Sequence, residues 1–181
     1  TLLLMTDLGH EHYVGLATFN LEWALSELGE VERAKRLAEE NLERARSIGS
    51  KSLEARGLES VGGVAHDEGR FDDALAMKRD ALRIHIELGA THHLFDGLYR
   101  VANTHAHAGR SALAATLLSA SVALQQEAGI PVPLYLARDR EELLGVLHEQ
   151  LDDTAFAAAW EEGAALTLDE AVALALDQPA G

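Results

Sequence analysis

Apolar residues recur along the chain three and four residues apart, which is the spacing of an amphipathic helix. Two stretches, 31–48 and 71–88, show this pattern most clearly, and the opposite face of the first consists of Glu, Lys and Arg. The first stripe contains Val31, Ala34, Leu37, Ala38, Leu42, Ala45 and Ile48, and the second contains Phe71, Ala74, Leu75, Ala81, Leu82, Ile84 and Leu88. We therefore expect both stretches to be helices that bury one face.

Small residues repeat along the chain with a period of 40 residues. The series are Gly9, Gly49, Gly89 and Gly129; Gly29, Gly69 and Gly109; and Ala34, Ala74 and Ala114. Glycine just past a helix adopts the left-handed conformation that ends it, so two glycines per period indicate two helices per period. The pattern predicts helices at about 10–28, 31–48, 51–68, 71–88, 91–108, 111–128 and 134–150.

The alanine series falls early in the second helix of each period, where a small side chain lets the two helices of a pair approach closely. The residue twelve positions earlier in the first helix is also small in two repeats, Gly62 and Ala102, whereas the first repeat has Glu22. We expect close helix packing within these pairs.

The first nine residues continue the same register. TLLLMTDLG aligns with ALRIHIELG at 81–89 and with SVALQQEAG at 121–129. The chain thus opens in the second half of a second helix, and its first residue is Thr1 and not Met. We expect a piece of a longer array, in which the apolar residues Leu2 to Met5 are partly exposed or cover the end of the array.

Antiparallel helix pairs stacked in series form a solenoid. A period of 40 matches HEAT or armadillo repeats, about 40–47 residues long, better than tetratricopeptide repeats of about 34. The residue pattern favours the tetratricopeptide type, because the first helix contains a small residue, a glycine turn follows, and an alanine stands early in the second helix. We predict an all-α, right-handed superhelix of antiparallel helix pairs of this type, with a HEAT-like array as the alternative. A single domain, 1–177, would contain repeats at about 10–49, 50–89, 90–129 and 134–163.

The stretch AWEEGAALTLDEAVALAL at 159–176 departs from the period but still has a helical pattern. We expect Asp152 or Asp153 to cap a short helix that runs through Trp160 and that Gly163 ends.

A capping box is predicted next, in which the Thr167 hydroxyl accepts from the amide of Glu170 and the Glu170 carboxylate reaches back. It would begin a final helix at 167–177 that covers the last helix pair, as terminal units of solenoids do. Residues 178–181 would be a tail.

Composition narrows the classes of partner. The net charge of −15 predicts repulsion from nucleic acid and anionic membranes. The chain has no cysteine and no apolar run of about 18 residues, so we expect no disulfide, no thiolate chemistry and no membrane span. A cytoplasmic protein is the expectation.

No motif in the sequence predicts catalysis, a cofactor or a metal. The string Gly49-Ser50-Lys51-Ser52 lacks the first glycine of a phosphate loop, and Ser50 is better explained as a helix N-cap. The histidine pairs, none at the i, i+3 or i+4 spacing of helical metal ligands, are His10/His12, His92/His93 and His105/His107. The carboxylate pairs Asp72/Asp73 and Asp152/Asp153 fall at predicted helix starts, where negative charge complements the helix dipole.

Residues 97–176 resemble the C-terminal repeat region of LuxR-type regulators and of related bacterial signalling proteins that join an ATPase or nucleotide cyclase to helical repeats. The matching stretches are GLYRVANTHAHAGRSALAATLLSASVALQQEAGIPVP and FAAAWEEGAALTLDEAVALAL. The resemblance implies a sensing or partner-binding arm that follows an ATPase and in some members precedes a DNA-binding module.

In tetratricopeptide arrays the first helix of each pair lines the concave face. Carried onto this register, the resemblance implies a groove at Phe19, Trp23, Arg56, Glu59, His66, Tyr99 and Asn103, with Gly63 beside them. A Trp facing a Gly suggests room for a peptide side chain or a small ligand. The alternative is that Phe19 and Trp23 are core residues of a terminal repeat.

These observations favour a non-catalytic segment of a larger signalling or transcriptional regulator that binds a protein, a peptide or a small effector. A free-standing scaffold that joins proteins is the alternative. A metal-dependent enzyme that uses groove histidines is a third hypothesis.

Overall fold

The computed structural model describes residues 11–176, which form nine helices and no strand. The helices are α2 (Glu11–Glu27), α3 (Val31–Ser47), α4 (Lys51–Asp67), α5 (Phe71–Glu87), α6 (Thr91–His107), α7 (Ser111–Glu127), α8 (Leu134–Gln150), α9 (Asp153–Ala164) and α10 (Leu168–Leu176). The predicted all-α class is confirmed, and the predicted helices agree with the observed ones to within about one residue at either end. The residues divide into two compact units, unit 1 up to Ile84 and unit 2 from His85.

The periodic glycines end the helices as predicted. Gly29, Gly49, Gly69, Gly89, Gly109 and Gly129 all have a positive φ, between 63° and 77°. After α2 the backbone N–H of Glu30 donates to Leu25 O and that of Gly29 donates to Ser26 O, both at 2.9 Å, which is the Schellman arrangement. Each of the first five turns contains only three residues. Within each unit, such short turns bring consecutive helices alongside one another. Gly9 lies outside the described residues.

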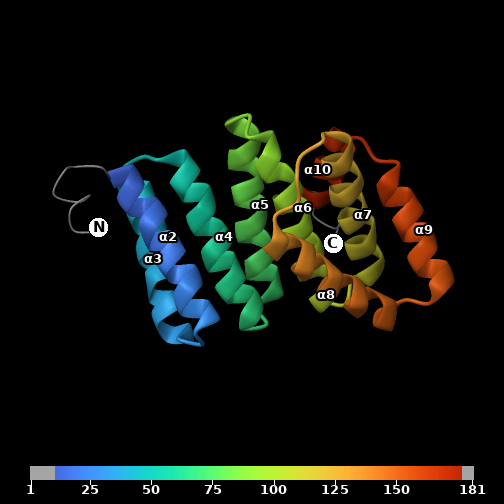
Figure 1. Cartoon of the computed structure of the whole chain (residues 1–181), viewed down its shortest axis with the longest axis horizontal. Coiled ribbons are helices and arrows are strands. Elements are labelled where there is room, and N and C mark those ends of the chain that lie inside the picture. The colour runs from blue at the N-terminus through green and yellow to red at the C-terminus, as the bar shows by residue number, and fades with distance from the viewer. Residues whose placement is uncertain (1–10, 177–181) are drawn as a thin grey trace. The chain divides into compact units, whose positions relative to one another are not determined.

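Unit 1 is built from α2, α3, α4 and α5 as far as Ile84, with consecutive helices side by side (Figure 1). One hydrophobic cluster of its core joins α3, α4 and α5 through Leu42, Ala55, Leu58, Ala81 and Ile84. Two glycines of α4 permit close packing in this cluster. A Cβ on Gly57 would lie 2.8 Å from Leu42 Cα, and one on Gly62 would lie 3.4 Å from Ala74 O. The close approach predicted for Gly62 and Ala74 is therefore confirmed.

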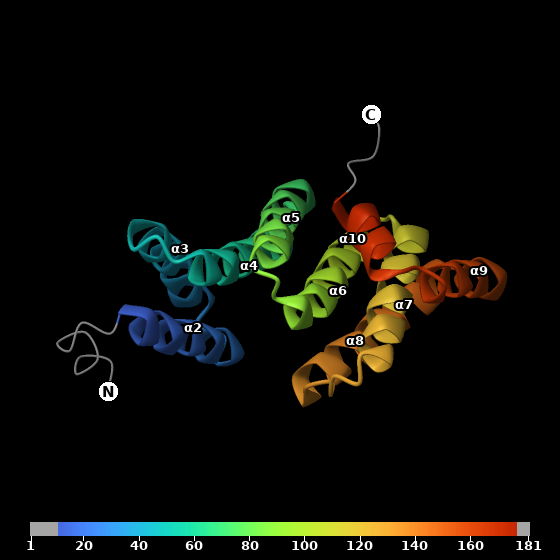
Figure 2. The same cartoon turned by 90° about the horizontal axis from the view of Figure 1, so that it is seen from above.

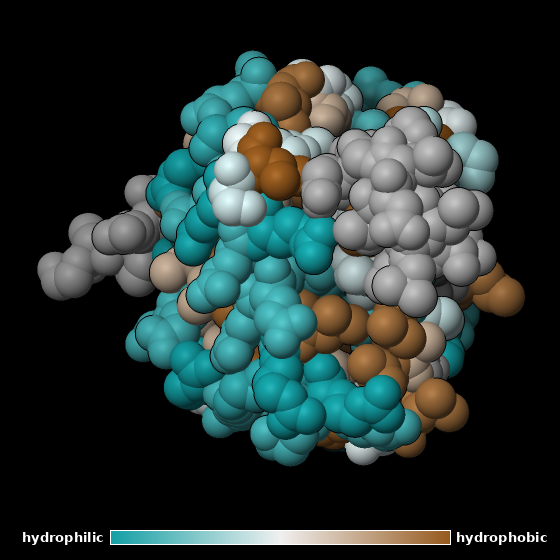
Figure 3. Space-filling view, turned by 90° about the vertical axis from the view of Figure 1, so that its left-hand side faces the viewer, coloured by the Kyte–Doolittle hydropathy of each residue, from teal (hydrophilic) through white to brown (hydrophobic). Residues whose placement is uncertain are grey.

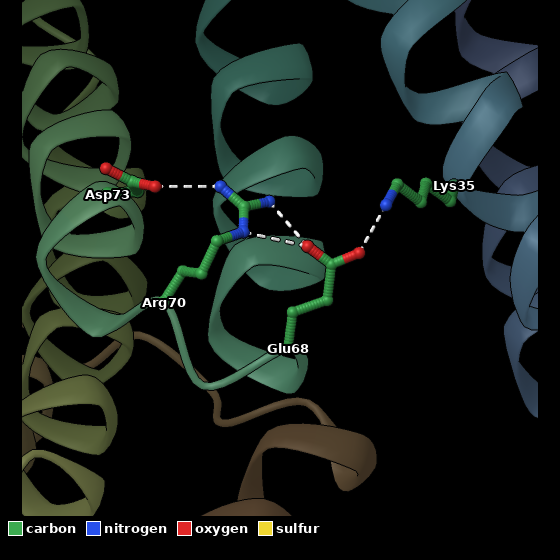
Figure 4. Close-up of polar contacts among 4 residues, drawn as sticks. All are labelled: Lys35, Glu68, Arg70 and Asp73. Atoms are coloured by element: carbon green, nitrogen blue, oxygen red, sulfur yellow. Dashed lines mark hydrogen bonds and ion pairs between the residues drawn. The ribbon is translucent and has the colours of Figure 1, made fainter.

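An ion network ties α3 to the turn between α4 and α5 (Figure 4). Lys35 of α3 donates to Glu68, which also accepts two bonds from Arg70, at 2.8 and 2.6 Å. Arg70 donates in turn to Asp73 at 2.8 Å. The Lys35 ammonium, and after it Arg70, holds the pKa of the Glu68 carboxyl below its ordinary value. Because these groups are exposed, the network stabilises unit 1 only slightly and serves mainly to orient the turn.

In unit 2, α7 lies between α6 and α9, and α10 packs on α6 and α7 (Figure 2). The approach of α9 to α7 is very close, since a Cβ on Gly163 would lie 2.0 Å from Thr116 O. The Ser119 hydroxyl donates to Trp160 O at 2.6 Å and links the same two helices. The helix end predicted at Gly163 is correct to within one residue, since α9 ends at Ala164. The role of the glycine differs from the prediction: Gly163 has no positive φ, and glycine is needed there because no side chain fits against α7.

Two of the three predicted helix caps are confirmed. Asp152 is the N-cap of α9 and accepts from the Ala155 amide at 2.8 Å. Before α10, the Thr167 amide donates to the Glu170 carboxylate at 2.9 Å, and the Glu170 amide donates to the Thr167 hydroxyl at 3.3 Å. Ser50 occupies the N-cap position of α4, but its side chain makes no capping hydrogen bond. The predicted tail, 178–181, lies outside the described residues.

The regular spacing ends between α7 and α8. Six residues separate these helices instead of three, so α8 is shifted by three residues relative to the 40-residue register. The connection is held by Gln125, whose side-chain amide donates to Pro131 O at 3.3 Å. The shift changes which side chains α8 presents to α6 and α7.

Candidate functional site

The first helices of the two pairs in unit 1, α2 and α4, meet through Phe19 and Arg56. The Arg56 guanidinium carbon lies 5.1 Å from the centre of the Phe19 ring, a cation–π distance. Phe19 is only 5% exposed and packs with Ala45 and Leu53. The groove position expected for Phe19 is therefore wrong. Its ring belongs to the core, and the guanidinium of Arg56 on the neighbouring helix covers it.

Trp23 lies on the same side of α2 as Phe19, one turn further along, and is 62% exposed. It is therefore a surface residue and not part of a terminal core. On α4, Gly63 lies two turns beyond Arg56 on the same side, and a Cβ there would meet no described atom within 4 Å. The faces of α2 and α4 that meet at Phe19 thus carry two features. Trp23 is an exposed aromatic side chain on α2, and Gly63 is an open position on α4.

Glu22 lies beside Trp23 and is half-buried between the helices of unit 1. Burial raises the pKa of its carboxyl, and this effect exceeds the lowering by Ser60, Asn41 and Arg56. Its Oε2 atom is shielded from solvent and makes no hydrogen bond to any described residue. Since Ser60 is in α4, the Glu22–Ser60 contact places Trp23 and Gly63 within about one turn of each other along the two helices.

Two further predicted residues of α4, Glu59 and His66, are half-buried. The His66 ring contacts the edge of Phe71, the first residue of α5, with the ring centres 5.5 Å apart. His66 therefore lies at the end of α4 that leads into α5, beyond the level of Trp23.

In unit 2, the predicted groove residue Tyr99 of α6 is buried, with 8% exposure. Burial, and then the negative charge of Asp139 in α8, raises the pKa of its phenol. The expectation that Tyr99 lines an open surface is therefore wrong, because α8 packs on this side of α6. Asn103 is half-buried, and its backbone carbonyl lies 2.9 Å from Nδ1 of His107.

A buried arginine, which the sequence reasoning missed, anchors α8. Arg140 is 6% exposed, and its Nη2 donates to Ser121 Oγ at 2.8 Å and to Gln125 Oε1 at 2.7 Å. Ser121 in turn donates to the backbone carbonyl of Phe95 at 2.7 Å, so Arg140 joins α6, α7 and α8. Burial lowers the pKa of Arg140, while Asp96 and Tyr99 raise it by smaller amounts.

A signal for Arg140 was present in the sequence. With the three-residue shift of α8, its position corresponds to Gly57 in α4 and Gly97 in α6. Both glycines are buried, and Gly57 touches the preceding second helix. An arginine at this repeat position must either be exposed or find buried acceptors, and Ser121 and Gln125 are those acceptors.

The histidines do not form a metal centre in the part of the chain that the structure describes. No group of three or more His, Asp or Glu side chains in residues 11–176 is placed to hold a metal ion. His93 instead stacks on His85 with ring centres 4.5 Å apart, and His92 lies 4.0 Å from His93. Such contacts are ordinary aromatic packing.

None of the described helices is both long and apolar enough to cross a membrane. Comparison of the chain with family models, curated proteins and solved structures gives no match.

Proposed function

We propose that this chain is a non-catalytic binding segment with tetratricopeptide-like repeats in a right-handed superhelix, and that it binds a peptide segment of a partner protein. The exposed Trp23 beside the open position at Gly63 carries the proposal. A large, exposed aromatic side chain on a helix is the kind of residue that dominates the binding energy of protein interfaces.

The surroundings of Trp23 suit an apolar side chain of a ligand. Phe19 and Arg56 form a packed base one turn away, so the α2–α4 face can bind without rearranging. The position at Gly63 has room for a side chain that would stack against the indole. Glu59 and Arg56 are half-buried at the edge of this area and can accept from or donate to a peptide backbone.

In this proposal the segment works as an arm of a larger regulator and transmits partner binding to an ATPase or DNA-binding module. That part rests on the resemblance of residues 97–176 to the repeat regions of LuxR-type regulators. A free-standing scaffold would use the same α2–α4 face, and the full-length gene would distinguish the two.

The test is selection of linear peptides from a phage-displayed random library on the Trp160→Phe variant, in which Trp23 is the only tryptophan. We expect peptides with an apolar or aromatic residue to be enriched, to change Trp23 fluorescence, and to lose at least about tenfold in affinity with Trp23→Ala, a hot-spot effect. Gly63→Leu should also block binding, because its side chain fills the open position.

Circular dichroism of both variants provides the control, since helix content should be unchanged. The proposal is wrong if no peptide is enriched, or if the enriched peptides bind Trp23→Ala and Gly63→Leu as tightly as the parent.

A further inference from the structure

Three aromatic rings form a stack across the joint between α8 and α9 in unit 2. The ring centre of His148, in the last turn of α8, lies 4.0 Å from that of Phe156 in α9. The ring centres of Phe156 and Trp160 are 5.4 Å apart, and these two rings are within 21° of parallel. Only residues 151 and 152 separate the two helices, so this aromatic stack forms where α8 and α9 meet (Figure 1).

The aromatic stack belongs to the surface, although the backbone that carries it is firmly packed. His148 is exposed, and Phe156 and Trp160 are half-buried. Leu147, the neighbour of His148 in sequence, is fully buried, and the backbone carbonyl of Trp160 accepts the hydrogen bond from Ser119 in α7. The rings are therefore held in place before a partner arrives, which lowers the entropy that binding would cost.

The side of α8 that carries His148 is open one turn earlier, at Gly145. Gly145 is exposed, and a Cβ there would meet no described atom within 4 Å. Residues three apart lie on the same side of a helix, so the open position adjoins His148. In the part of the chain that the structure describes, this leaves space for a partner beside the aromatic stack.

The sequence around the aromatic stack is acidic throughout. Residues 141–176 contain nine Asp and Glu and neither Lys nor Arg. All nine of these acidic residues are exposed. Asp153 lies one turn before Phe156 on the same side of α9, and Glu161 follows Trp160 in sequence. The aromatic stack therefore lies in a negative electrostatic field.

Unit 1 has no such charge bias on its charged helix. The helix α3 carries five Lys and Arg beside four Glu, and Figure 3 shows hydrophilic side chains over much of the α2–α3 end of unit 1. Unit 1 also supplies its own cation to an aromatic ring, since the Arg56 guanidinium lies 5.1 Å from the centre of the Phe19 ring. Residues 141–176 offer aromatic rings and carboxylates, but no ammonium or guanidinium group of their own.

A guanidinium group fits both features of this surface. It is a planar cation that stacks on aromatic faces, best on Trp, and its N–H groups donate in pairs to a carboxylate. An ammonium group is also attracted by carboxylates, but it is not planar and it is more strongly hydrated. The surface should therefore bind arginine in preference to lysine.

We infer that the aromatic stack and the carboxylates beside it form a docking surface for an arginine-rich segment of a partner protein. One arginine of the partner stacks on the exposed part of the rings, and neighbouring arginines pair with Asp153 and Glu161. This surface belongs to unit 2, and the inference does not depend on the peptide site proposed at Trp23.

The test is a titration with two synthetic peptides of equal length and charge, one in which arginines alternate with glycines and one in which lysines do. The protein is the Trp23→Phe variant, in which Trp160 is the only tryptophan. Salt at about 150 mM screens long-range attraction between the acidic protein and any polycation. We expect the arginine peptide to change the Trp160 emission and to bind at least about fivefold more tightly than the lysine peptide.

Two variants of the aromatic stack, Trp160→Leu and His148→Ala, test whether the rings make the contact. Fluorescence anisotropy of a labelled arginine peptide measures their affinity, and each should bind at least about fivefold more weakly than the parent because a cation–π contact is lost. Circular dichroism checks the fold. If Trp160→Leu loses helix content, His148→Ala decides, since His148 is exposed.

The carboxylates are tested by a matched pair of double variants. Asp153→Asn with Glu161→Gln should weaken binding of the arginine peptide at least about fivefold, because two charge-assisted hydrogen-bonding sites are lost. Glu32→Gln with Glu39→Gln removes the same charge from exposed positions of α3 in unit 1 and should change the affinity less than about twofold.

Three results would overturn the inference. The first is no binding of the arginine peptide, and the second is equal affinity for the arginine and lysine peptides. The third is an affinity that the two variants of the aromatic stack leave unchanged, or that the two double variants reduce equally. The second and third results would assign binding to the net charge of the chain alone.

Discussion

The α2–α4 contact of unit 1 and the α6–α8 contact of unit 2 both join first helices of neighbouring pairs, but only the second is closed. Phe19 and Tyr99 occupy the same repeat position, 80 residues apart. Phe19 is covered by Arg56, and the surface reopens one turn later at Trp23. Over Tyr99, α8 packs down and is held there by Arg140.

The difference arises at one repeat position. Where α4 and α6 have Gly57 and Gly97, the shifted α8 has Arg140. A glycine lets a first helix lie directly against the preceding second helix, whereas Arg140 reaches that helix through hydrogen bonds. A repeat position can therefore provide an open surface or a closed contact, depending on the side chains that the next first helix supplies.

The largest expected effect comes from breaking the closed contact. Arg140→Ala leaves Gln125 Oε1 without its donor and opens a cavity, so the free energy of unfolding of unit 2 should fall by about 2–4 kcal/mol. Urea denaturation followed by circular dichroism measures the change.

Arg138→Ala is the control for Arg140, since the Arg138 side chain is 62% exposed on the same helix and should cost less than about 0.5 kcal/mol. Equal losses for the two variants would show that Arg140 does not hold α8 in place.

Two glycine substitutions in α4 should change the stability of unit 1 in opposite directions, by smaller amounts, and they test whether the α2–α4 face is open at Gly63. Gly63→Ala meets open space in a helix and should stabilise unit 1 by roughly 0.5–1 kcal/mol. Gly57→Ala would bring a Cβ within 2.8 Å of Leu42 Cα and should destabilise it by roughly 1–3 kcal/mol. Thermal unfolding of both variants under identical conditions measures these changes. If both variants were more stable than the parent, or both less stable, the predicted difference between Gly57 and Gly63 would be wrong.

The smallest effect concerns pH and Glu22. Because burial raises the pKa of Glu22 in the folded protein, its stabilising contribution is present at a pH below its unfolded value, about 4.5, and is lost as the pH rises through the folded pKa. Glu22→Gln should therefore be more stable than the parent near neutral pH and gain nothing below about pH 4, as urea denaturation across this pH range would measure.

The exposed Glu39→Gln serves as the control for Glu22, because it carries the same charge change on the surface. A stability difference between Glu22→Gln and the parent that is the same at all pH values would show that the burial of this carboxyl has no energetic consequence.

The helices and their ends were predictable from the sequence because they depend on local physics. The glycines past each helix, the apolar stripes and the Thr167–Glu170 capping box act within a few residues of one another, so the pattern carries the information directly. The close packing at Gly62 and Ala74 was predictable as well, because the 40-residue period aligns two small residues that face each other within one helix pair.

The roles of the predicted groove residues depended on what the next helix brings. Trp23 and Phe19 are four residues apart on one face, yet one is exposed and the other buried, because Arg56 reaches the first turn and no described residue covers the second. Tyr99 is buried by α8. The spacing of the sequence already showed that α8 is shifted by three residues, but it did not show that α8 packs over Tyr99.

The sequence by itself determined the helical class, the element boundaries and the repeat register of this protein, since these follow from backbone conformation and side-chain spacing. Only the tertiary structure decided which repeat positions are exposed and which are buried. Burial, the hydrogen bonds of Arg140 and the close contact at Gly163 depend on side chains distant in sequence, and a periodic pattern cannot show whether such a partner is present.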